Sequence, residues 1–151
     1  MKKIMIALEY ASSDACLINT GIALARAFDG SMRLLHVAPG GDQGFIGYGP
    51  GPQSTRDALA AELRVRHEHI LQKAQKMSAD LVPTDALMAQ GPIPETIAEQ
   101  VHGWEAELLV MGDHKRGLLT RVLAGRLHDG VLKHIQCPVL VVPVTEEGQC
   151  A

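Results

Sequence analysis

The chain has 151 residues, a formal net charge of −3 and only 3% aromatic residues. This length predicts a single domain that covers residues 1–151. The charge and the low aromatic content argue against a nucleic-acid-binding protein, which usually has a basic face and residues that stack on bases. No apolar segment approaches the roughly 18–20 residues needed to cross a bilayer, so we expect no contact with a membrane.

The amino terminus and the cysteines favour a cytoplasmic protein. The opening MKKIMIALEYASSD has only a short apolar run before Glu9, so it does not predict a signal peptide. Cys16, Cys137 and Cys150 are odd in number, widely spaced and form no CxxC pair. This pattern fits a reducing cytoplasm and predicts no metal site.

The first half of the chain predicts two strands separated by a helix. Residues 1–8 predict a short strand in which Ile4, Met5, Ile6 and Leu8 form a nearly continuous apolar run, as in a parallel strand that is covered on both faces. Ser12, Ser13 and Asp14 offer N-caps for a helix that runs to about Phe28, and Gly30 is placed to end it. Residues 32–38 (MRLLHVA) predict the second strand.

A glycine- and proline-rich loop and a long helix follow. Residues 39–53 lack the GxGxxG spacing of a dinucleotide-binding turn, so we interpret them as a surface loop. Ser54 and Asp57 resemble a capping box that opens a helix to about Ser78. We expect His67 and His69 to be solvated histidines, because residues two apart point to different faces of a helix. The buried side is predicted to carry Leu59, Leu63, Ile70 and Leu71.

The second half predicts three more strands. Residues 84–89 form a third strand, GPIPETIAEQVHGW a turn and a helix, and residues 107–111 a fourth strand. Residues 138–144 (PVLVVPV) form the last strand. Repeated alternation of strands and helices predicts a parallel sheet with helices on both faces. Ligands of such sheets bind beyond the carboxyl ends of the strands, which directs attention to residues 9–13, 37–40, Gly91 and the loop that begins at Gly112.

Four segments resemble the universal stress protein family. These are KKIMIALE, LLHV, GPIPETIAEQVHGWEAELLVMG and MGDHKRGLLTRVLAGRLHDGVLKHIQCPVLVV. The resemblance implies a five-stranded, Rossmann-like parallel sheet with strand order 3-2-1-4-5. It also implies a homodimer joined through the final strand. The sequence favours that dimer independently, since an apolar strand at a sheet edge needs a cover, and Val139–Val142 of a second copy would provide it.

Many members of this family bind ATP or another adenine nucleotide through the signature G-x2-G-x9-G followed by Ser or Thr. In this chain Gly112 and Gly125 match the first and last glycines, whereas Lys115 and Arg126 replace the second glycine and the Ser/Thr. Glu9 replaces the aspartate that usually ends the first strand. The candidate nucleotide-binding residues implied by the resemblance are Ala7, Leu8, Glu9, Val37, Met111, Gly112, His114, Lys115, Gly125, Arg126 and Leu127.

Some of these positions have a second interpretation. Val37 would contact adenine through its backbone, but it is equally compatible with an ordinary core valine. His114 would contact a ligand or cap the loop, and the sequence leaves both interpretations open. We interpret His36, beside Val37, as an interior histidine with its polar groups satisfied rather than as a catalyst.

The substitutions in the signature leave two functions open. Long side chains at positions 115 and 126, together with Glu9, would fill or pair across the site, and the protein would then be a regulatory stress-response homodimer that acts through protein partners. Alternatively, Lys115 and Arg126 supply charged donors to the phosphates of ATP or AMP, with Mg²⁺ accompanying ATP. In that case nucleotide binding would order the 39–53 loop for a partner.

The sequence gives little support to an enzyme. It contains neither a GxSxG nucleophile turn nor a GxxxxGK[ST] phosphate loop. A receiver-type phosphoacceptor needs a carboxylate after the third strand, which instead ends in Ala89-Gln90-Gly91. We assign no catalytic residue and expect at most slow hydrolysis of bound ATP.

Overall fold

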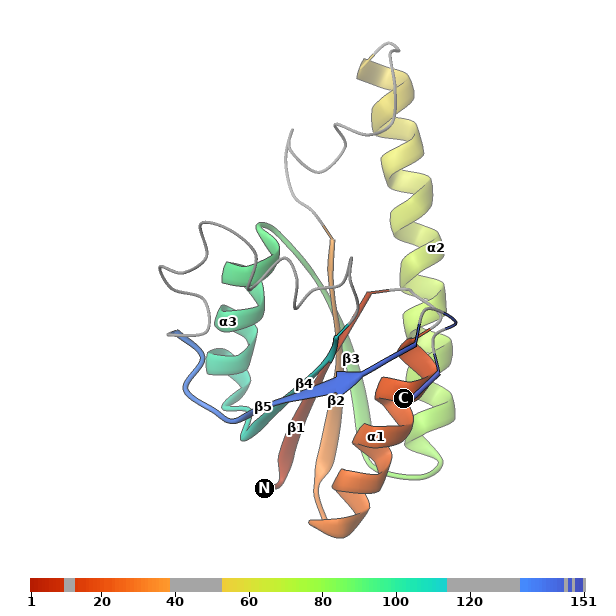
Figure 1. Ribbon diagram of the computed structural model, residues 1–151. Helices are drawn as coiled ribbons and strands as arrows, with labels where there is room; N and C mark the ends of the chain where they lie inside the picture. Colours follow the sequence, from red (N-terminus) through yellow and green to blue (C-terminus); the bar gives the residue numbers. More distant parts are fainter. Residues whose placement is uncertain (10–12, 39–52, 114–133, 146, 148, 151) are drawn as a thin grey trace.

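The computed structural model describes residues 1–9, 13–38, 53–113, 134–145, 147, 149 and 150 (Figure 1). It contains one five-stranded parallel sheet in the order β3-β2-β1-β4-β5, which confirms the predicted architecture. The strands are β1 (Lys3–Leu8), β2 (Ser31–Ala38), β3 (Thr84–Gln90), β4 (Leu108–Asp113) and β5 (Val139–Pro143). None of the helices in the described ranges is long and apolar enough to span a membrane.

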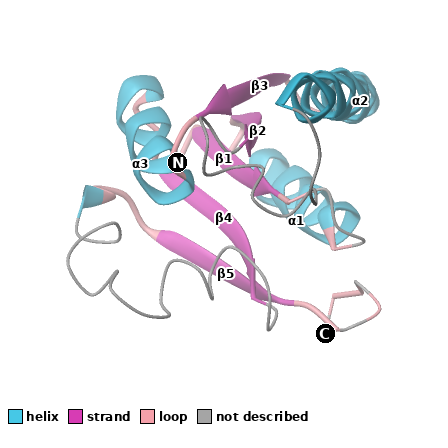
Figure 2. Ribbon diagram, turned by 90° about the horizontal axis from the view of Figure 1, so that it is seen from above, coloured by secondary structure: helices cyan, strands magenta, loops and turns pink. Residues whose placement is uncertain are grey.

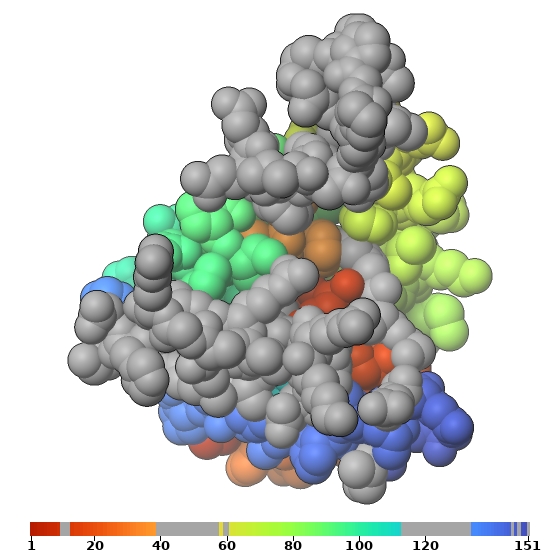
Figure 3. All heavy atoms as spheres, turned by 45° about the horizontal axis from the view of Figure 1, so that its top comes forward, coloured from red at the N-terminus to blue at the C-terminus, as the bar shows by residue number. Residues whose placement is uncertain are grey.

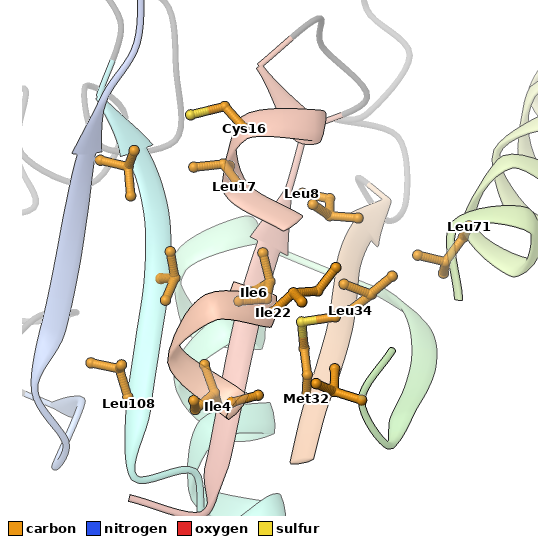
Figure 4. Close-up of a cluster of buried hydrophobic side chains, with 14 residues drawn as sticks. Ile4, Ile6, Leu8, Cys16, Leu17, Ile22, Met32, Leu34, Leu71 and Leu108 are labelled. Atoms are coloured by element: carbon orange, nitrogen blue, oxygen red, sulfur yellow. The ribbon is translucent and has the colours of Figure 1, made fainter. Parts of the chain in front are cut away.

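Helices cover both faces of this sheet. Figure 2 shows α1 (Asp14–Ala27) and α2 (Gln53–Ala79) on one face and α3 (Ile93–Trp104) on the other. Alternate residues of the strands therefore enter two apolar clusters. Ile4, Ile6 and Leu8 pack with α1 and α2 (Figure 4), whereas Met5 and Ala7 pack with α3. Because both faces of β1 are buried, its residues 4–8 are all apolar.

The end of α1 differs from the prediction in one detail. The left-handed residue after the helix is Asp29, with φ 50°, and not Gly30. Gly30 has a different role, because a Cβ atom at this position would lie 2.8 Å from the backbone oxygen of Lys2. The missing side chain thus permits the close approach of the turn to the start of β1.

Within α2 the predicted buried side is partly wrong. Leu71 is buried and Leu63 half-buried, but Ile70 is 46% exposed. His67 is half-buried, and its ring lies edge-on to His36 with 5.4 Å between the ring centroids, so it is not a freely solvated histidine. His69 is exposed as expected. The helix begins at Gln53, one residue before the predicted cap Ser54; the side chains of Ser54, Asp57 and Leu59 lie outside the described residues.

The start of β1 is held by the segment that precedes β4. The Glu107 carboxylate accepts hydrogen bonds from the backbone N–H groups of Lys2 and Lys3. These two bonds lower the pKa of Glu107. The central strand is therefore fixed at its first residues by a part of the chain that is more than a hundred residues away in the sequence.

A disulfide joins Cys16 to Cys150, with 5.5 Å between the Cα atoms. The spacing of the cysteines did not predict this pairing, because the two residues are 134 positions apart along the chain. The two residues meet because the chain after β5 returns to the beginning of α1. Cys137 has a free thiol and is half-buried.

Candidate functional site

β1 is the topological switch point of the sheet, where the strands that follow are added first on one side and then on the other. The chain leaves β1 through α1 to form β2 on one side, and it returns through α3 to form β4 on the other. Pairing between β1 and β4 ends at Ile6 and Val110, although β1 continues to Leu8 and β4 to Asp113. The carboxyl ends of these strands therefore separate at the position where open parallel sheets receive ligands.

The structure brings several candidate residues together on the α3 face. Ala7, Val37 and Met111 are buried in one cluster, which also contains Ile97 of α3. Leu8 belongs to the opposite cluster, with α1 and α2, so its side chain lies on the other face of the sheet. In Figure 3 residues of β1 and β2, coloured red and orange, lie between α3 in green and α2 in yellow.

The remaining candidates occupy the ends of β1 and β4. Gly112 is buried in β4, and Glu9 is half-buried directly after β1. The other candidates, His114, Lys115, Gly125, Arg126 and Leu127, lie outside the described residues. Among the described candidates the only charged residue is thus Glu9, at the end of the central strand, and the others are apolar residues or glycine.

A contact between α1 and β1 fixes the position of Glu9. The backbone N–H of Glu9 donates a hydrogen bond of 3.1 Å to Oδ1 of Asp14, in the first turn of α1. The sequence indicated Asp14 only as a possible helix cap and carried no signal for this contact. The neighbouring Ser13 hydroxyl is buried and has no hydrogen-bond partner among the described residues.

His36 lies at the same end of β2 and is an interior histidine, as predicted. Its Nδ1 atom is 3.3 Å from the backbone oxygen of Leu8. A carbonyl oxygen only accepts hydrogen bonds, so Nδ1 carries the proton of the neutral ring. Burial lowers the pKa of His36 to about 4, and the same effect lowers the pKa of His67. Neither ring is therefore a cation for phosphate near neutral pH.

The turn between β3 and α3 is closed by packing. Gly91 has φ 149°, and its N–H donates to the backbone oxygen of Ala38 at the end of β2. A Cβ atom on Gly91 would lie 2.6 Å from Oγ1 of the buried Thr96. Glycine is required here by the backbone conformation and by the first turn of α3, which accounts for this residue without a ligand.

The described strand ends are acidic or neutral. Glu9 follows β1 and Asp113 ends β4, while Ala38, Gln90 and Pro143 end the other strands. No lysine or arginine is present at these five ends. The apolar side chains on the α3 face are buried against α3, and cations for the phosphates of a nucleotide would have to come from positions such as Lys115 and Arg126, outside the described residues.

Comparison with known proteins agrees with this architecture. The sequence profile of the universal stress protein family matches residues 1–143. The chain belongs to the universal stress protein family.

Two relatives of this universal stress protein match along most of their length. It is 27% identical over 147 residues to universal stress protein D of Escherichia coli K12, covering 97% of this chain and 98% of the relative. It is 31% identical over 143 residues to the universal stress protein in the QAH/OAS sulfhydrylase 3' region of Thermus aquaticus, covering 91% and 96%.

Solved structures share the fold of this universal stress protein. A family member from Burkholderia pseudomallei has a TM-score of 0.70 at 20% identity, covering 95% of this chain and 96% of that one. An Arabidopsis thaliana family member with AMP bound has a TM-score of 0.66 at 19% identity, covering 97% and 94%. A universal stress protein in complex with cAMP has a TM-score of 0.60 at 16% identity, covering 95% and 98%.

One contact near this site could have been found from helical spacing. His67 lies four residues after Leu63 and four before Leu71, so these three side chains share one face of α2. That face packs on the sheet, and His67 reaches His36 there. The two-residue spacing of His67 and His69 led to the prediction that both are solvated. That prediction is wrong for His67, which is a polar residue on the apolar face of α2.

Proposed function

We propose that this universal stress protein is a cytoplasmic, homodimeric stress-response regulator whose adenine-nucleotide site is degenerate, and that it acts through protein contacts. The observation that carries the proposal is the acidic end of the central strand. Glu9 takes the position at which family members have an aspartate, and its backbone N–H is already bonded to Asp14. A nucleotide that approached Glu9 would bring negatively charged phosphates, and none of the described strand ends carries a cation that would neutralise them.

The size of Glu9 supports the same conclusion. Glutamate is one methylene longer than aspartate, so its carboxylate lies farther from the backbone that Asp14 fixes. A half-buried carboxylate in this position repels phosphate unless a cation compensates it. Lys115 and Arg126 are the cations nearest in sequence to the signature glycines. If both pair with Glu9, neither can bind the phosphates of a ligand.

A second function follows from the nucleotide-bound structural relatives. One of them holds AMP and another cAMP. If Lys115 and Arg126 point to the phosphates instead of to Glu9, this protein is an adenine-nucleotide sensor, with ATP accompanied by Mg²⁺. Ala7, Val37 and Met111 support this alternative, since these three candidate residues lie together in one cluster near the carboxyl ends of their strands.

Isothermal titration of the purified protein with ATP, ADP, AMP and cAMP separates these functions. For the degenerate site we expect no saturable heat and no rise in melting temperature at millimolar nucleotide. A sensor would gain about 2.7 kcal/mol of stability at a hundredfold excess over its dissociation constant. Mass spectrometry of protein purified without added nucleotide provides an independent measurement, and a co-purified adenine nucleotide would overturn the degenerate site.

Restoring the signature provides the matching test by substitution. A triple variant, Glu9→Asp with Lys115→Gly and Arg126→Ser, should gain ATP binding if these residues block the site. Glu99→Asp makes the same acidic change at an exposed position of α3 and should leave binding unchanged. A triple variant that folds but binds no ATP would contradict the proposed blockage.

The dimer is tested at β5. This strand is at one edge of the sheet, and Leu140 and Val141 are each 36% exposed. Glutamates at both positions would face like charges across a pair of symmetric strands, so Leu140→Glu with Val141→Glu should shift sedimentation toward the monomer. Val65→Glu, on an exposed position of α2, is the control. A wild-type protein that sediments as a monomer would refute the dimer.

A further inference from the structure

The segment after β5 is attached to the beginning of α1 by a covalent bond. Cys16 is in the first turn of α1 and is 6% exposed, whereas Cys150 is exposed. Their Cα atoms are 5.5 Å apart, within the ordinary range for a disulfide. Figure 4 shows Cys16 at one end of the apolar cluster, with its side chain directed toward the side of β4 and β5.

The described contacts of this segment other than the disulfide are few. Val144 pairs with Cys150 in an isolated antiparallel bridge and packs against the apolar cluster. The N–H of Thr145 donates to the backbone oxygen of Gln149, and the N–H of Gln149 donates to Oγ1 of Thr145. These hydrogen bonds form a small turn within the segment and do not join it to α1. Among the described residues, the bond to Cys16 is therefore the main attachment of the segment to α1.

We propose that Cys16 and Cys150 form a reversible redox site, in which oxidation fixes the segment that carries Val144, Thr145, Gln149 and Cys150 to the first turn of α1 and reduction releases it. The reaction partners are low-molecular-weight thiols and disulfides of the glutathione type. Disulfides in reducing compartments are usually transient and redox-sensing, which agrees with the predicted cytoplasmic location. The proposal does not depend on whether the protein binds a nucleotide.

Unequal exposure of the two sulfurs decides the direction of the exchange. A small thiolate can reach Sγ of the exposed Cys150 more easily than Sγ of the buried Cys16. Its attack forms a mixed disulfide on Cys150 and expels Cys16 as a thiolate, which takes a proton from water. The backbone N–H groups in the first turn of α1 favour a negative charge on this leaving sulfur.

A second thiol completes the reaction. It attacks the external sulfur of the mixed disulfide, which releases Cys150 as a thiolate that takes up a proton. In total, two small thiols are oxidised to one disulfide, and the protein disulfide is reduced by two electrons to two thiols. Oxidation by a glutathione-type disulfide is the reverse sequence and returns two small thiols.

The position of Cys16 connects this reaction to the end of the central strand. Cys16 lies two residues after Asp14, whose carboxylate holds the N–H of Glu9. Release of the segment therefore removes a restraint from the same helical turn that fixes the carboxyl end of β1. This segment also directly follows β5. Its release therefore changes the restraint on the sheet edge at which the second copy is proposed to bind.

The test uses the full chain in buffers with defined ratios of reduced to oxidised glutathione. Thiols are blocked with iodoacetamide, and the peptides are analysed by mass spectrometry. We expect the linked peptide of Cys16 and Cys150 to increase with the oxidised fraction, while Cys137 stays alkylated throughout. A failure of the pair to form, pairing through Cys137, or reduction only after the protein has unfolded would overturn the proposal.

Hydrogen exchange then measures the release. On reduction we expect the amides of Thr145 and Gln149 to exchange at least tenfold faster, while the circular dichroism of the protein remains native. Cys150→Ser changes an exposed residue and should make exchange independent of redox state, whereas Cys137→Ser should preserve the response. Equal protection of the segment from hydrogen exchange in the oxidised and reduced proteins would show that the disulfide does not control its release.

Discussion

Gly21 offers a test of how closely α1 packs on the sheet. This glycine is buried in the middle of α1 and has an ordinary helical conformation. A Cβ atom here would lie 2.5 Å from Cδ1 of Ile6 and 2.8 Å from Sδ of Met32. Both neighbours are almost fully buried, at 0% and 1% exposed, so neither can move into solvent to make room. We therefore expect Gly21→Ala to destabilise the protein.

Two opposing effects determine the size of the loss. Alanine restricts the unfolded chain more than glycine and would stabilise a compatible helical site by about 0.4–1 kcal/mol. Forcing a methyl group into a filled core costs about 1–3 kcal/mol. The packing effect is larger, which leaves a net loss of about 1–2 kcal/mol in the free energy of unfolding. For a chain of this length each kcal/mol corresponds to about 2–4 °C in melting temperature.

Gly103 is the matched control because it has no neighbour within 4 Å of its would-be Cβ atom. It is exposed near the end of α3, so Gly103→Ala should be neutral or stabilise by up to about 1 kcal/mol. Urea unfolding of both variants measures the difference. If Gly21→Ala proves as stable as Gly103→Ala, the contact of α1 with β1 and β2 is looser than these distances indicate.

Two further predictions concern the core and its buried histidine. The pKa of His36 is lowered to about 4 in the folded protein from an ordinary 6.5. As the pH falls, the unfolded chain therefore takes up a proton on this residue before the folded protein does. The free energy of unfolding should decrease between these two pH values by at most about 1.4 kcal/mol per pH unit. Urea unfolding at several pH values should show a flatter profile for His36→Gln, while the exposed His69→Gln keeps the wild-type slope; equal slopes in all three proteins would contradict the assignment. Leu17→Ala empties a fully buried position and should cost about 2–5 kcal/mol in the same assay, compared with less than about 1 kcal/mol for Leu81→Ala, which alters a half-exposed side chain.

Most of the fold could be predicted because the strands of a parallel sheet have a strong sequence pattern. The run at residues 4–8 is apolar at every position because alternate side chains enter two different clusters. The strand order came from family resemblance, since periodicity places elements along the chain but does not pair them. Ile70 shows the limit of spacing within a helix: it lies next to the buried Leu71 but faces away from the sheet.

The site was harder to predict because its contacts join distant segments. The bond from the backbone N–H of Glu9 to Asp14 is local, but backbone groups carry no sequence signal. His36 and His67 meet across two elements, and Cys16 and Cys150 meet across nearly the whole chain. Ala7, Val37 and Met111 lie together in one buried cluster near the carboxyl ends of their strands, and their role in nucleotide binding stays a prediction.

The middle position of β1 has a consequence for synthesis on the ribosome. Ile4 pairs with Met32 of β2 and with Leu108 of β4, and the first amides of β1 bind Glu107. During vectorial translation β2 becomes available early, whereas the other partner emerges only in the last third of the chain. β1 is thus synthesised before its neighbours but lacks one of its two pairing partners until β4 has been made. Its unpaired edge needs protection from aggregation until then.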